Sequence, residues 1–154
     1  MDNLIKTAAE VYENTAMPCG RVVHSDPTTP ATPEQLPLPP AVAKKPISQK
    51  SAAEWAYERV IMYLQNFEEQ LDKDHEVAMG FTGGSTGVLR IEGVGYFDPD
   101  LITFYGKDAT ETKVQLIQHV TQLNVMLRAV SKQTPDEDPP RRIGFRLAQD
   151  LGET

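Results

Sequence analysis

The residues best suited to chemistry lie in a glycine-rich loop in the middle of the chain. Five of them are consecutive: Thr82, Gly83, Gly84, Ser85 and Thr86. Backbone amides in such a turn can cradle an anion. A phosphate-binding loop, however, opens a helix and carries a lysine near its end, whereas this loop leads into an apolar run whose first basic residue is Arg90. We therefore interpret the loop as a hairpin turn, with anion or small-ligand binding as the alternative.

The other candidates for chemistry are histidines, acids and a single cysteine. His75 lies in a charged turn, and His119 lies among polar residues on one face of the predicted second helix. The two histidines lack the sequence spacing of a metal site. Asp98 and Asp100 flank Pro99, which favours a turn rather than acid catalysis. Cys19 alone excludes an intramolecular disulfide. The sequence predicts no cofactor and no metal, and it gives no support for an enzyme.

Composition bounds the partners and the compartment. The chain has 154 residues with 22 acidic and 15 basic side chains, a net charge of −7, which disfavours nucleic acid and anionic membrane as partners. No apolar run is long enough to cross a bilayer, and the first residues lack the basic start and apolar core of a signal peptide. The expectation is a soluble cytoplasmic protein.

The 12 prolines divide the chain because they are concentrated in its first third and its tail. Residues 1–47 are predicted to form a disordered arm with a short helix near its start, and residues 135–154 a mostly disordered tail. Residues 48–134 are predicted to form the folded domain. The arm contains Leu36-Pro37-Leu38-Pro39-Pro40, which is either a spacer or a polyproline II ligand for an aromatic groove.

A helix is predicted from Ser51 to about Leu71. Ser51 as N-cap places Glu54 at the third helical position, which is a capping box. One stripe of the helix is apolar, but four further apolar side chains lie outside it: Trp55, Ile61, Met62 and Tyr63. A helix that is apolar on two faces is either sandwiched within its own domain or covered by a second subunit. The small domain favours the second interpretation, an interface on these four residues.

Three strands are predicted after this helix, at 77–81, 87–96 and 101–105, and a second helix at 110–131. Residues 141–147 alternate well enough to add an edge strand. The expected fold is therefore α+β, with the element order α-β-β-β-α, a small antiparallel sheet and both helices on one face. The other face of the sheet would be left for solvent or a partner.

Two resemblances accompany this pattern. The element order resembles the double-stranded-RNA-binding domain, which implies RNA binding through basic residues at the start of the last helix; Lys107 and Lys113 occupy the matching positions without forming a cluster. The blocks 93–102 (GVGYFDPDLI) and 118–124 (QHVTQLN) resemble those of a small uncharacterised bacterial domain family over residues 51–130. That resemblance implies a self-standing domain of bacterial or phage-related origin, and it does not point to any particular activity.

The sequence thus favours a non-enzymatic module for protein-protein interaction or oligomerisation. The expected partner is a second copy in a homodimer, bound through the Trp55 and Met62 side of the first helix or through the exposed sheet, and the N-terminal arm could bind a further protein. A ligand site formed by the glycine-rich loop and His119 is the first alternative. RNA binding is the second.

Overall fold

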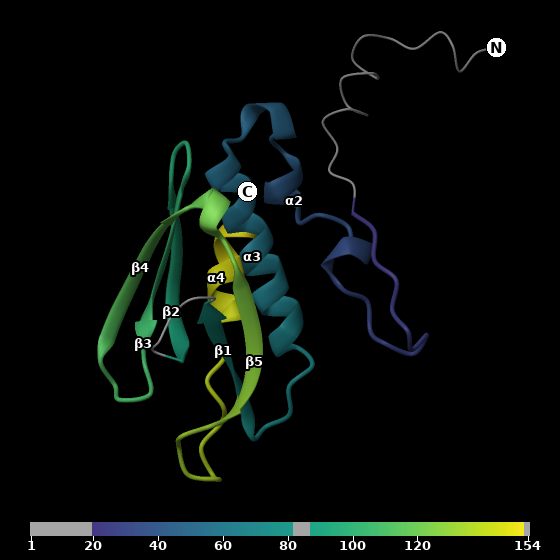
Figure 1. The fold of residues 1–154 in the computed structure, drawn as a ribbon. Coiled ribbons are helices and arrows are strands. Elements are labelled where there is room, and N and C mark those ends of the chain that lie inside the picture. The colour runs from purple at the N-terminus through teal and green to yellow at the C-terminus, as the bar shows by residue number, and fades with distance from the viewer. Residues whose placement is uncertain (1–19, 82–86, 153–154) are drawn as a thin grey trace, which may run out of the picture.

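The computed structural model describes residues 20–81 and 87–152, and its architecture is α+β, as predicted (Figure 1). The helices are α2 (Pro40–Ala43), α3 (Ala52–Glu68) and α4 (Gly144–Gly152), with short 3-10 turns η2 (Pro33–Gln35), η3 (Ile47–Gln49) and η4 (Val120–Gln122). The strands are β1 (His75–Phe81), β2 (Val88–Phe97), β3 (Leu101–Lys107), β4 (Lys113–His119) and β5 (Val125–Ser131).

The five strands form one antiparallel sheet in the order β4-β3-β2-β1-β5. The three predicted strands are confirmed as β1, β2 and β3, and the turn at Asp98 to Asp100 joins β2 to β3. β1 and β2 pair only at Met79–Leu89 and Gly80–Val88, whereas β2 and β3 pair along most of their length around a bulge between Ile91 and Gly93. The sheet therefore opens between β1 and β2 on the side away from their shared loop.

The predicted first helix is confirmed as α3. Ser51 is its N-cap, and its hydroxyl accepts a hydrogen bond from the amide of Glu54 at 3.0 Å, as the capping-box sequence predicts. The Glu54 carboxylate pairs instead with Lys45 at 3.1 Å. The Ser51 hydroxyl also donates to Asp98, and the Ala53 amide donates to the carbonyl of Pro99, so the start of α3 is fixed to the β2–β3 turn.

The core lies between α3 and one face of the sheet. Its buried side chains come from both layers: Leu64, Val77, Met79, Leu89, Ile91, Ile102 and Phe104. The predicted α3 stripe, including Val60 and Phe67, packs against this cluster. The Phe81 and Phe104 rings meet edge to face at 5.0 Å. We call this the inner face of the sheet and the opposite one the outer face.

The prediction of a helix at 110–131 is wrong, because β4, η4 and β5 occupy this segment. Its apolar residues satisfy both a helical and an alternating pattern: Val114 and Leu116 alternate in β4, as Val125 and Leu127 do in β5, and all four pack on the core. Many of its apolar residues are β-branched, which favours strands. The sheet accordingly has five strands rather than three.

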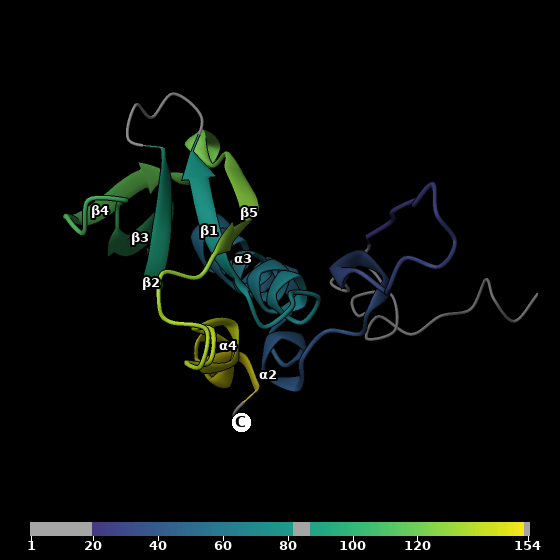
Figure 2. The same ribbon diagram turned by 90° about the horizontal axis from the view of Figure 1, so that it is seen from below.

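Residues 141–147 do not add an edge strand. Residues 141–143 lie against β1 and β2 where these strands part, and α4 begins at Gly144. Figure 2 shows α4 beside α3, on the same side of the sheet. Leu147, Ala148 and Leu151 recur with a helical period, which places all three in a second apolar cluster on α3. This packing favours a helix over the edge strand that the alternation of residues 141–147 predicted.

The second apolar face of α3 is covered by its own chain. Val42 of α2 and Leu151 of α4 pack there with Trp55 and Ile61, and Val42 is completely buried. Val42 and Ile47 thus pack on the domain, although they belong to residues 1–47, for which the sequence predicts a disordered arm. The predicted short helix near the start of the arm lies outside the described residues.

Candidate functional site

The four residues predicted to form an interface on the first helix are largely accounted for within the chain. Trp55 is 5% exposed and Ile61 is fully buried, both in the cluster with Val42 and Leu151. Met62 is half-buried against the same cluster. Tyr63 is exposed, and its hydroxyl donates a hydrogen bond to Glu34 of the arm. The sandwiched helix, the alternative left open by the sequence, is the arrangement present.

A buried ion pair lies beneath this cover. The ammonium of Lys50 is 2.8 Å from the carboxylate of Glu58, donates to the carbonyl of Val42 at 2.5 Å, and lies 4.1 Å from the centre of the Trp55 ring. Burial raises the pKa of Glu58 above its ordinary value of 4.5, although its contact with Lys50 opposes the shift. These contacts join residues 42–50 to α3, and they are structural rather than ligand-directed.

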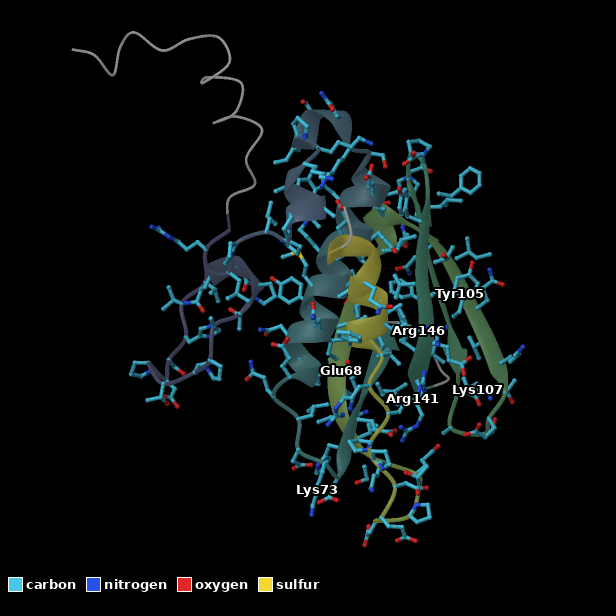
Figure 3. All side chains as sticks on the ribbon, turned by 180° about the vertical axis from the view of Figure 1, so that it is seen from behind. Glu68, Lys73, Tyr105, Lys107, Arg141 and Arg146 are labelled. Carbon is cyan, nitrogen blue, oxygen red and sulfur yellow. The ribbon has the colours of Figure 1, made fainter. Side chains whose placement is uncertain are left out.

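Two further buried carboxylates hold the segment before α4. Glu68 accepts hydrogen bonds from the amides of Ile143 at 2.9 Å and Gly144 at 2.5 Å. Glu76 accepts from the amide of Arg141 at 2.6 Å and forms an ion pair with Arg90. Figure 3 shows Glu68 on α3 and Arg141 on the segment that leads into α4. Both acids are thus engaged by amides and a guanidinium of the chain itself.

Arg141 and Arg142, which belong to the segment before α4, also hold it through their own side chains. The guanidinium of Arg141 donates to the carbonyl of Ile91 in β2. Arg142 donates to the carbonyls of His75 at 2.7 Å and Asp72 at 2.8 Å. His75 itself contacts the Asp72 carboxylate at 2.7 Å, and this hydrogen bond lowers the pKa of Asp72. His75 therefore belongs to a structural turn.

The alternative ligand site is only partly visible. Thr82, Gly83, Gly84, Ser85 and Thr86 lie outside the described residues. His119 is at the end of β4, where it contacts Asp100 at 3.2 Å and Thr121 at 2.8 Å. Within residues 20–81 and 87–152, no group of three histidine, cysteine, aspartate or glutamate residues is placed to hold a metal ion. The same residues include no helix that is long and apolar enough to cross a membrane.

The outer face of β2, β3 and β4 carries three large exposed apolar side chains, Phe97, Tyr105 and Ile117. Directly paired residues of antiparallel strands share a face. Three rows cross it: Phe97, Leu101 and His119; Gly95, Thr103 and Ile117; and Gly93, Tyr105 and Gln115. Phe97 is 74% exposed, Ile117 58% and Tyr105 42%. Figure 3 shows Tyr105 beside Lys107 on β3.

A basic row follows these three on the same face. Arg90, Lys107 and Lys113 are paired across β2, β3 and β4. Arg90 is held by Glu76 and by the carbonyl of Ser131, and Lys107 is 3.9 Å from Glu111. Lys107 ends β3 and Lys113 begins β4, so neither lies at the start of a helix. Within the described residues, the α-β-β-β-α order on which the resemblance to the RNA-binding domain rests is therefore not present.

β4 and β5 are the two edge strands of the described sheet. β4 pairs with β3 over seven uninterrupted residues and contains neither proline nor a bulge, two of the devices that protect a sheet edge; its one lysine, Lys113, lies at its first position. Its outward residues Lys113, Gln115, Ile117 and His119 are exposed, and its inward residues Val114 and Leu116 are only half-buried. Among the described residues no strand pairs with the other side of β4, which is therefore available to a further strand.

Sequence reasoning missed this edge because it assigned β4 to a helix. The alternation Lys113-Val114-Gln115-Leu116 was the signal that could have identified it. It also missed the four buried side chains Lys50, Glu58, Glu68 and Glu76, whose partners are far away in the sequence or in segments with no regular pattern.

Comparisons with known proteins place the chain in a family but do not assign an activity. No curated protein and no solved structure matches it. A family model does match residues 45–146, which contain α3 and the whole sheet. Because this match covers more than half of the chain, the protein belongs to the family described as "Family of unknown function (DUF6173)".

Proposed function

We propose that this chain is a non-enzymatic protein-interaction module that forms a homodimer by pairing the free edge of β4 with β4 of a second copy. The observation that carries the proposal is the open edge itself: seven regular residues, paired on one side, with apolar residues on both faces. An edge of this kind binds another strand through main-chain hydrogen bonds, and side chains then set the specificity.

Two-fold symmetry fixes a register for this pairing. Two copies of one strand related by a two-fold axis run antiparallel, and pairing all seven residues of β4 centres the contact on Leu116. Leu116 then faces its own counterpart on the inner side. On the outer side, Gln115 of each copy faces Ile117 of the other. The half-buried apolar residues of the edge would thereby lose their remaining contact with water.

The other edge is less suited to self-pairing. β5 spans Val125–Ser131, so its midpoint is Arg128, which is exposed. A symmetric pairing of β5 would place two arginines opposite each other, and like charges directly opposite each other destabilise a strand pair. The central residue thus favours β4 over β5 as the dimer edge.

Charge variants on the outer side of β4 test the proposal. Gln115→Lys together with Ile117→Lys places lysine opposite lysine at both outer positions, and we expect the dimer dissociation constant to rise about tenfold or more. The matched control, Gln115→Glu with Ile117→Lys, places opposite charges there and should retain the dimer. Both sites are exposed, so the monomer fold should persist. Equal dissociation constants for the two variants would refute this register.

A cytoplasmic, bacterial setting is part of the same proposal. One cysteine in 154 residues fits a reducing compartment. A net charge of −7 favours a protein partner over nucleic acid or an anionic membrane surface. The resemblance of residues 93–102 and 118–124 to a bacterial domain family supports the bacterial setting.

A further inference from the structure

The side of α3 that carries Trp55 and Tyr63 forms a groove that a proline-rich segment of the same chain occupies. Residues 31–39 cross it as a short 3-10 turn followed by extended backbone, with φ −102° and ψ 150° at Leu36 and φ −55° and ψ 146° at Pro39. The latter angles are close to polyproline II. We call this face of α3, from Trp55 to Asn66, the proline groove.

Contacts of three kinds hold the segment in the proline groove. Pro33 is buried, and Leu38 packs on the cluster that contains Trp55 and Ile61. The side-chain amide of Asn66 donates to the main-chain carbonyl of Ala31 at 2.9 Å, a contact that any residue at that position could make. The Tyr63 hydroxyl donates to Glu34. Proline, leucine and a main-chain carbonyl are thus the features that the groove recognises.

The fit between segment and groove is incomplete. A hollow of about 180 Å³ remains between Pro33, Leu36 and Leu38 of the segment and Trp55, Arg59 and Met62 of α3. A second hollow of about 180 Å³ lies along Met62, Gln65 and Asn66. Leu36 is 43% exposed although it borders both hollows. Unfilled apolar space forgoes the contacts that stabilise a complex, so this segment leaves room for a better ligand.

The groove and its occupant also differ in their relation to the family. The match to the family begins at residue 45, so α3 with the whole proline groove lies within it, whereas residues 31–39 lie outside. The groove belongs to the unit that the family shares. The segment that fills it belongs to the flank of this chain.

We propose that the proline groove binds an extended proline- and leucine-rich segment of another protein, and that residues 31–39 occupy the groove in its place until they are displaced. The cis segment then regulates access, because a tethered competitor acts at a high effective concentration. This surface is separate from the β4 edge, so dimerisation through β4 could fail without affecting it, and the reverse also holds.

Trp55 provides the readout because it is the only tryptophan and borders the groove. The probe is a peptide of residues 28–41 added to the full chain. In the release variant Pro33→Asp with Leu38→Asp, two charges replace apolar contacts, and we expect Trp55 emission to shift to the red and its quenching by acrylamide to increase. The peptide should reverse both changes and bind the release variant about tenfold or more tighter than it binds the wild type.

Two controls make the result specific. A peptide carrying the same two aspartates should not reverse the changes, and a release variant that also carries Met62→Asp should not bind the unaltered peptide. If the release variant loses its far-UV circular dichroism, Pro33→Ala with Leu38→Ala reduces the apolar contacts of the segment without adding charge and without altering the groove, and it is tested in the same way. Equal affinity of the peptide for wild type and released chain, or equal binding of both peptides, would overturn the proposal.

Discussion

Glu68 near the end of α3 accepts a hydrogen bond from the amide of Gly144, 76 residues later in the chain. The first amides of a helix have no partner within it, and Glu68 supplies one for the start of α4, together with the amide of Ile143. A carboxylate at a helix N-terminus also interacts favourably with the helix dipole. This contact joins α4, and with it the cover over Trp55, to the central helix.

We expect Glu68→Gln to lower the free energy of unfolding by about 1–3 kcal/mol, as measured by urea denaturation. Glutamine retains one acceptor but presents an amino group to the other backbone amide, which leaves a buried donor without a partner. Glu69→Gln, at the exposed neighbouring residue, is the control and should change stability by less than about 0.5 kcal/mol. Similar losses in both variants would contradict this role of Glu68.

Two glycines in the sheet should respond in opposite ways to alanine. A Cβ at Gly106 would be 2.4 Å from the carbonyl oxygen of Arg90, a backbone atom that cannot move away cheaply. Gly106→Ala should therefore destabilise the protein by about 1–3 kcal/mol in thermal or urea unfolding. A Cβ at Gly93 would meet only the Tyr105 side chain at 3.5 Å, an ordinary contact, so Gly93→Ala should be tolerated. Equal losses of stability for the two substitutions would show that β2 and β3 do not approach closely at Gly106.

The buried pair of Glu58 and Lys50 gives a pH dependence of defined sign. Burial raises the pKa of Glu58 in the folded state, so this residue contributes stability that is fully present below pH 4.5 and is lost as the pH rises through the folded-state pKa. The difference in unfolding free energy between wild type and Glu58→Gln should therefore become less favourable to wild type between pH 4.5 and 7. Urea denaturation at several pH values measures it, and a difference that grows with pH would contradict this sign.

Local signals predicted the first half of the domain well. The Ser51 cap, the α3 stripe and the alternation of Leu89 and Ile91 act within a few residues, and the structure agrees with them. In residues 110–131, Val114, Ile117 and Val120 satisfied a helical period while Val114 and Leu116 satisfied a strand period. The pairing of β4 with β3 and of β5 with β1 decided between them, and no local pattern reveals such pairing.

The same reasoning applies to the second apolar face of α3. Trp55 and Ile61 indicated correctly that α3 must be covered on its second face, but the cover comes from Val42 and Leu151, in segments that were expected to be largely disordered. Both segments pack against α3 through a few apolar residues that are separated by polar ones, a pattern that does not identify them as folded. The N-terminus of α4 is held by Glu68, a distant partner that composition and periodicity do not identify.

The molar mass of the full chain in solution tests the central proposal most directly. Light scattering during size-exclusion chromatography, over a range of loading concentrations, should give twice the chain mass of 17.1 kDa for the wild type. It should give the monomer mass for Gln115→Lys with Ile117→Lys at low loading. A wild-type chain that has the monomer mass at every concentration would contradict dimerisation through β4.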